Sequence, residues 1–237
     1  MSGIFITGTD TAVGKTVICG CLARFLREEG RDVVTQKLVQ TGCEGYSEDL
    51  LTHLRLGGED RGEHPEKIEA DRCPCILGLP ASPHLAAAEE DTTVNPEELL
   101  AAFRRLHTDY EMVLVEGAGG PAVPVTEELL LVDLVARLSV PAILVADNRL
   151  GCINHSLLAV EALQRREIPI IGIIFTNTQS RPDDAVHRDN PRIIETMSDV
   201  PVLGELPYLP GLNDVHKHFE PIGRTFLSHF PKVIDDE

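Results

Sequence analysis

Short apolar runs alternate along the chain with segments whose apolar residues recur at helical spacing. The runs that predict buried strands cover residues 4–6, 33–37, 112–115, 142–145, 170–175 and 202–207. The segments that predict helices begin near residues 17, 47, 83, 96, 151 and 211. Strands that alternate with helices are typical of a mostly parallel sheet with helices on both faces. The pattern therefore predicts a single α/β domain over residues 1–237 that ends in a helix and an acidic tail, whereas residues 57–80 have no clear period.

The segment 8–16 joins the first predicted strand to the first predicted helix and has the residues of a phosphate-binding loop. Gly8 and Gly14 let the backbone turn its N–H groups toward phosphate oxygens, and the start of the helix adds its positive end. Lys15 contributes a point charge, and the Thr16 hydroxyl can ligate Mg²⁺. Five residues separate the two glycines, where the common spacing has four, so a glycine- and threonine-rich turn without function is the alternative. The strand and helix around the loop favour a P-loop NTPase-like fold.

Composition and charge narrow the classes of partner. The chain of 237 residues has a formal net charge of -17, which disfavours binding to nucleic acid or to an anionic membrane. No apolar run reaches the ~20 residues of a spanning helix, and the N-terminus has no basic leader. The six cysteines include no C-x-x-C pair, so we expect reduced thiols and a cytoplasmic protein.

Charged residues follow two of the predicted strands at the point where each strand ends. Lys37 lies at the carboxyl end of the second strand, and Glu116 directly follows the strand 112–115. Parallel strands meet at the same edge of a sheet, so we expect both residues beside the phosphate-binding loop. Thr16 and Glu116 then provide ligands for Mg²⁺, with Asp49 as a third. The alternatives are a solvated lysine, a loop carboxylate, and an aspartate that only stabilises a helix start.

Five segments in order along the chain resemble the dethiobiotin synthetase family. They are Gly8–Thr16, Lys37, Ser82-Pro83-His84, the run Val115-Glu116-Gly117-Ala118-Gly119-Gly120 and the run Leu150-Gly151-Cys152-Ile153-Asn154-His155. The longer loop spacing is that family's own pattern. The resemblance implies an ATP- and Mg-dependent ligase of biotin synthesis that uses 7,8-diaminononanoate and CO2. It also implies a carbamate that is phosphorylated by ATP and then closed to a ureido ring by the second amine.

The same resemblance implies a role for each matching residue. Lys15 and Lys37 would stabilise the carbamate and phosphoryl charges, and Thr16, Asp49 and Glu116 would hold Mg²⁺. The implied ATP contacts are Ala12, Val13, Gly14, Lys15, Thr16, Val17, Glu116, Gly117, Ala118, Gly119, Asn177, Thr178, Pro207, Tyr208 and Leu209. The implied diamine contacts are Thr11, Lys37, Thr41, Ser82, Pro83, Gly151, Cys152, Ile153 and Asn154. The last four of these come from the partner subunit, because the family is a homodimer with its substrate site at the subunit interface.

The chain also departs from the family's pattern. Ala12 stands where the family often carries glutamate, which costs the site one acidic group. Leu38 stands where proline is usual, so we expect a looser Lys37 loop and a shifted preference among related diamines. Two other functions use related folds. One is a nucleotide-switched partitioning ATPase, which carries an extra lysine early in the loop where this chain has Thr9-Asp10-Thr11. The other is a synthetase of the cobyrinate or CTP amidoligase type.

Overall fold

The computed structural model of the protein describes residues 3–59, 70–182 and 184–235. Residues 60–69, in the segment for which no elements were predicted, lie outside the described residues. The same holds for residues 236 and 237 of the predicted acidic tail.

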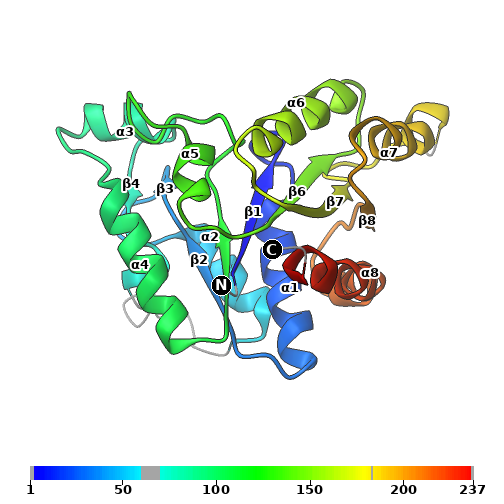
Figure 1. The fold of residues 1–237 in the computed structure, drawn as a ribbon, viewed down its shortest axis with the longest axis horizontal. Coiled ribbons are helices and arrows are strands. Elements are labelled where there is room, and N and C mark those ends of the chain that lie inside the picture. The colour runs from blue at the N-terminus through cyan, green and yellow to red at the C-terminus, as the bar shows by residue number, and fades with distance from the viewer. Residues whose placement is uncertain (1–2, 60–69, 183, 236–237) are drawn as a thin grey trace.

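A six-stranded parallel sheet forms the centre of the molecule (Figure 1). Its strands are β1 (Gly3–Gly8), β2 (Val33–Lys37), β5 (Met112–Glu116), β6 (Ala142–Asp147), β7 (Ile170–Thr176) and β8 (Val202–Leu206). Their order is β2-β5-β1-β6-β7-β8, and every pairing between neighbours is parallel. In this register Glu116 lies opposite both Lys37 and Ile6, so β2, β5 and β1 end at the same edge.

Helices cover both faces of the sheet because neighbouring residues of each strand point to opposite sides. Ile4 and Ile6 pack with α1 (Lys15–Glu28), α2 (Glu48–Gly57) and α8 (Val215–Asp235). The side chain of Phe5, between them, packs on the other face with α4 (Pro96–Asp109) and α5 (Leu131–Ala136). The helices α6 (Cys152–Gln164) and α7 (Ala185–Ser198) continue that second layer over β6 and β7. The predicted α/β fold class is therefore confirmed.

Five described elements were not predicted from the apolar pattern, one of which is the short 3-10 helix η2 (Ala70–Arg72). The helix α5 has only six residues, too few to show a helical period. The helix α7 buries only Asn190 and Ile194 and contains Pro191, so its pattern is mostly polar. The strands β3 (Gln40–Thr41) and β4 (Ile76–Leu77) pair only with each other. Short α3 (Pro83–Glu89) begins where a helix was predicted.

Among the described helices, none has the length and apolar character needed to span a bilayer.

Gly20 of α1 lies where this helix packs closely against α2. A Cβ at Gly20 would lie 2.8 Å from Leu56 Cβ and 3.3 Å from His53 Cα. Backbone atoms cannot move aside as a flexible side chain does, so we expect Gly20→Val to lower the free energy of unfolding by about 2 kcal/mol. Chemical denaturation measures the effect. Gly211→Val is the control, because a Cβ there meets no atom within 4 Å. Equal stability of the two variants would contradict the expected close packing.

Candidate functional site

The loop between β1 and α1 has a backbone shape that favours a phosphate-binding role. Ala12 and Gly14 have φ angles of 58° and 93°, in the left-handed region, so the chain turns sharply just before α1 begins. Lys15 Nζ donates to the carbonyl oxygen of Asp10 at 2.7 Å. Thr176 Oγ1, at the end of β7, donates to the carbonyl oxygen of Val13 at 2.7 Å. These bonds hold the loop against the sheet edge, with the N-terminal end of α1 behind it.

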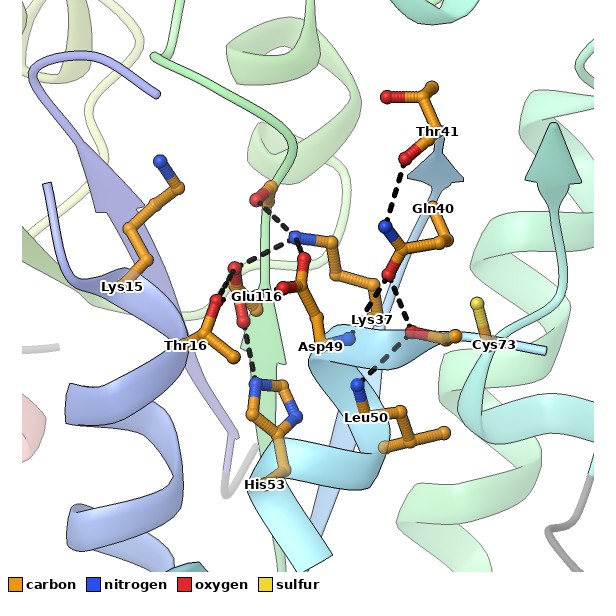
Figure 2. Close-up of polar contacts among 12 residues, drawn as sticks. Lys15, Thr16, Lys37, Gln40, Thr41, Asp49, Leu50, His53, Cys73 and Glu116 are labelled. Carbon is orange, nitrogen blue, oxygen red and sulfur yellow. Dashed lines mark hydrogen bonds and ion pairs between the residues drawn. The ribbon is translucent and has the colours of Figure 1, made fainter. Parts of the chain in front are cut away.

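Thr16, Lys37, Asp49 and Glu116 form one contiguous cluster beside this loop (Figure 2). Thr16 Oγ1 lies 3.1 Å from Asp49 Oδ1 and 3.1 Å from Glu116 Oε1. Lys37 Nζ lies 2.6 Å from Asp49 Oδ2 and 2.7 Å from Glu116 Oε1. The structure thus brings together the strand-end residues, the threonine of the loop and the aspartate of α2.

The cluster keeps its charges although it is buried. The side chains of Lys37 and Glu116 are 5% and 1% exposed. Burial opposes ionisation of Glu116, but the Lys37 ammonium and the hydrogen bond from His53 outweigh it, so the pKa of Glu116 lies well below its usual range. Burial likewise opposes the charged form of Lys37, but Glu116 and Asp49 outweigh it and raise its pKa above the usual range. The site therefore holds a stable ammonium between two carboxylates.

Lys15 has a different electrostatic environment. Burial lowers the pKa of Lys15 to about 8, an effect that Glu116 opposes and the nearby Lys37 ammonium reinforces. An anionic phosphate next to Lys15 would favour its charged form. The charged form of Lys15 is therefore more stable beside an anionic ligand than in the protein alone.

The start of α2 sets the position of Asp49. Ser47 caps the helix, as the sequence predicts, and its Oγ accepts from the backbone N–H of Leu50 at 3.1 Å. The same hydroxyl donates to Gln40 Oε1 at 2.6 Å, and that oxygen also accepts from the backbone N–H of Asp49 at 3.4 Å. Gln40 was not predicted as a site residue, because its strand has only two residues.

Leu38, the residue after Lys37, forms a backbone hydrogen bond to β5. Leu38 was expected to loosen the Lys37 loop, because leucine stands here where proline is usual in the dethiobiotin synthetase family. Its backbone N–H, which a proline would lack, donates to the carbonyl oxygen of Glu116 at 3.2 Å. Its side chain is 1% exposed and packs in the core beneath β5. Leu38 therefore ties the Lys37 segment to β5 through its backbone, and the expected loosening relative to proline stays a prediction.

The donors around Thr16 fit a hard divalent cation. A hydroxyl and two carboxylates supply oxygen ligands, which Mg²⁺ prefers. No group of three or more His, Cys, Asp or Glu side chains placed to hold a metal occurs among the described residues. Two carboxylates with a threonine hydroxyl and substrate phosphates suit Mg²⁺ nonetheless, because this ion binds through few protein ligands.

A cavity of about 530 Å³ opens beside the phosphate-binding loop, and the predicted diamine contact Lys37 is not among its lining residues. It brings together predicted diamine contacts from three parts of the chain, which are Thr11, Thr41, Ser82 and Pro83. The remaining lining residues are Asp10, Pro80, Ala81, Ala118, Gly119, Gly120 and Val123. The cavity combines apolar walls with hydroxyl groups and one carboxylate, so it suits an aliphatic chain that carries polar ends.

Asn177 lies at the ends of β7 and β8, on the other side of the loop. Its backbone N–H donates to the carbonyl oxygen of Leu206 at 3.0 Å, which places it beside Pro207, Tyr208 and Leu209. Its Nδ2 donates to Glu205 Oε1 at 2.6 Å. A carboxylate only accepts, so this bond fixes which way the amide points. Asn177 Oδ1 is buried and has no hydrogen-bond partner among the described residues.

Glu205 organises the surroundings of Asn177. Its Oε1 also accepts from Asn148 Nδ2 at 3.1 Å and lies 2.8 Å from His187 Nε2. The backbone N–H of Thr178 donates to Asp147 Oδ1 at 3.0 Å. Sequence reasoning missed Glu205, because a glutamate inside a short strand gives no sign of its partners.

The residues Gly151, Cys152, Ile153 and Asn154 lie at the start of α6 and do not line the cavity within this chain. Gly151 and Asn154 are exposed, whereas Cys152 is buried. Leu150 and Leu158 nearby are exposed to 83% and 56%. Arg149, just before this segment, approaches the loop, with its Nη2 3.7 Å from Asp10 Oδ2. The segment therefore presents an apolar surface close to the cavity.

Comparisons with known proteins agree with the sequence resemblance. A family model described as "AAA domain" matches residues 2–216. The ATP-dependent dethiobiotin synthetase BioD of Chlorobaculum tepidum is 40% identical over 204 residues, covering 86% of this chain and 84% of the relative. The protein of the same name from Thermodesulfovibrio yellowstonii is 35% identical over 236 residues, covering 97% of this chain and 96% of the relative.

Solved structures show the same fold at low identity. The cell division ATPase MinD of Pyrococcus furiosus matches with a TM-score of 0.61 and 15% identity, covering 96% of this chain and 99% of that chain. A plasmid partition protein of Borrelia burgdorferi, solved with AMPPNP, matches with a TM-score of 0.62 and 16% identity, covering 96% and 98%. These matches confirm the P-loop NTPase-like fold and carry nothing about the reaction.

Proposed function

Because this chain belongs to the family of ATP-dependent dethiobiotin synthetases, we propose that its site closes the ureido ring of dethiobiotin from 7,8-diaminononanoate, CO2 and ATP, with Mg²⁺ as the metal ion. The observation that carries this proposal is the contact of Lys37 with both Asp49 and Glu116, directly beside the phosphate-binding loop. This contact places a cation and two proposed metal ligands next to a phosphate-binding site. The free state of all six cysteines supports a reducing compartment, and we propose the cytoplasm.

The proposed reaction has three steps. One amine of the diamine adds to CO2 to form a carbamate, with loss of one proton. A carbamate oxygen then attacks the γ-phosphorus of ATP, ADP leaves, and a carbamic-phosphoric anhydride remains. The second amine attacks the carbamate carbon and loses one proton, the C–O bond to phosphate breaks, and inorganic phosphate leaves as the ring closes.

The residues of this chain serve charge stabilisation and orientation in these steps. Lys37 would stabilise the carbamate and the transferring phosphoryl group, and Lys15 would contact the phosphates from the loop. Thr16, Asp49 and Glu116 would hold Mg²⁺, which supplies neutralisation of phosphate charge. The cavity lined by Thr11, Thr41 and Ser82 would bind the aliphatic diamine.

An isotope experiment tests the phosphorylated carbamate. Because the carbamate oxygen bridges carbon and phosphorus before the C–O bond breaks, ¹⁸O from labelled bicarbonate should leave in inorganic phosphate. Mass spectrometry of the phosphate should show one ¹⁸O for each dethiobiotin formed, corrected for exchange with water. Unlabelled phosphate together with labelled dethiobiotin would contradict this route.

We also propose a homodimer in which residues 151–154 of one subunit complete the diamine site of the other. The exposed Leu150 and Leu158 beside this segment support an interface at the start of α6. Sedimentation of the protein at micromolar concentration should give twice the mass of the 25.9 kDa chain. A stable monomer that retains full activity would contradict the shared site.

Asn177 gives a prediction about the nucleotide base. Its buried Oδ1 accepts nothing from the described residues, so it suits the exocyclic amine of adenine, whereas guanine presents a carbonyl oxygen there. We expect Asn177→Ala to raise KM for ATP about tenfold and to reduce the preference for ATP over GTP. The KM for the diamine should not change and serves as the internal control. Unchanged discrimination between ATP and GTP would remove Asn177 from the base site.

A further inference from the structure

His53 is a fully buried histidine that contacts the proposed metal ligand Glu116. It lies on α2 four residues after Asp49, so both side chains lie on the same face of this helix. Figure 2 shows its ring pointing from α2 toward β5, and its Nε2 lies 2.6 Å from Glu116 Oε2. The His53 side chain is 0% exposed. No motif of the sequence singled it out.

The two carboxylate oxygens of Glu116 have separate partners. Oε1 contacts Thr16 Oγ1 and Lys37 Nζ, whereas Oε2 contacts His53 Nε2. A carboxylate only accepts, so Nε2 carries the proton of this bond in either charge state of the ring. The histidine therefore holds Oε2 away from the Thr16 side, and a single oxygen of Glu116 points toward the cluster.

Packing alone does not explain a histidine at this position. His53 Nδ1 is buried with no hydrogen-bond partner among the described residues. An unpaired buried nitrogen costs free energy that an aliphatic side chain of similar volume would avoid. The hydrogen bond to Glu116 is the contact for which a ring nitrogen is needed, and the aliphatic neighbours Leu50 and Leu56, three residues before and after His53, are buried on the same face of α2.

We infer that His53 is a positioning residue, which orients Glu116 so that only Oε1 faces the metal site. The inference rests on the proposed role of Glu116 as a Mg²⁺ ligand. A partner that orients a metal ligand typically changes metal affinity by 10–100-fold when it is lost. His53 then affects metal binding although it does not touch the metal, the substrate or the nucleotide.

Three substitutions distinguish the effect of the hydrogen-bond donor at position 53 from the effect of the side-chain volume. His53→Gln places an amide N–H at about the distance of Nε2, His53→Asn places it too close to the helix, and His53→Leu has no donor. The binding of Mn²⁺ in the presence of ADP is measured by electron paramagnetic resonance, and the Mg²⁺ concentration for half-maximal turnover is measured beside it. We expect a loss of about tenfold or more in His53→Leu and His53→Asn, and recovery to within about threefold in His53→Gln.

Leu54→Ala is the matched control, because Leu54 is buried on the same helix but directly follows His53, so the two side chains point to different sides of α2. It should lower the melting temperature and leave Mn²⁺ binding unchanged. Equal loss in His53→Gln and His53→Leu, or no loss in any variant, would overturn the inference. If His53→Leu does not fold, the comparison of His53→Gln with His53→Asn decides it. If the unmodified protein binds ADP without any metal dependence, the proposed metal site fails instead.

Discussion

Replacing Lys37 with alanine should lower kcat for dethiobiotin formation by about 100–1000-fold while ATP still binds. The ammonium lies within 2.7 Å of Glu116 Oε1 and 2.6 Å of Asp49 Oδ2, at the point where carbamate and phosphoryl charge would develop. Loss of this cation removes stabilisation of the transition state. ATP binding depends mainly on the loop 8–16, whereas the Lys37 ammonium contacts Asp49, Glu116 and the carbonyl oxygen of Gly117. Single-turnover kinetics and calorimetric titration with a non-hydrolysable ATP analogue measure the two quantities.

The matched control is Lys217→Ala, because Lys217 is 80% exposed and forms a surface ion pair with Asp214. It should behave like the unmodified protein. Lys37→Ala leaves the buried Glu116 with His53 and Thr16 as partners, so the variant should be less stable but folded. A Lys37→Ala protein with normal turnover would refute the role assigned to this ammonium.

Glu116→Gln should lower turnover by about 100-fold or more and raise the Mg²⁺ concentration needed for half-maximal activity. The amide has nearly the same shape as the carboxylate but carries no charge, so it is a poor ligand for a hard cation. It also leaves Lys37 with Asp49 as its remaining carboxylate partner. Metal titrations of the rate at saturating ATP measure the change.

Glu111→Gln controls for the loss of an acidic residue near β5, because Glu111 lies at the surface and pairs with Arg31. Its Mg²⁺ requirement should equal that of the unmodified protein. If Glu116→Gln keeps a normal Mg²⁺ requirement and loses only turnover, Glu116 does not bind the metal. Its function would then be limited to the ion pair with Lys37.

The sequence predicts the parts of this fold that depend on local pattern. Buried strands show continuous apolar runs. The glycines of the loop indicate a tight turn, because glycine adopts backbone conformations that other residues rarely adopt. The positions of Lys37 and Glu116 follow from the same reasoning, because parallel strands end at one edge. The apolar pattern fails for α7, whose exposed face and Pro191 hide the helical period.

The parts that the sequence does not predict depend on how distant segments pack. His53 meets Glu116 because α2 packs against α1 and β2, next to the end of β5, and Gly20 permits the close approach of α1 and α2. The hydrogen bond from Leu38 to β5 was missed for the same reason, since a backbone partner leaves no mark in the sequence. Glu205 gives a third example, with its partners just after β7, on α7 and in the loop after β6.

The measurement that tests the central claim most directly is ADP release by the purified protein with ATP, Mg²⁺ and bicarbonate, with and without 7,8-diaminononanoate. A ring-closing ligase should release one ADP per dethiobiotin and almost none without the diamine. A partitioning-type ATPase, which shares the fold, would hydrolyse ATP at the same rate in both samples. ADP release that does not depend on the diamine would therefore contradict the proposed function.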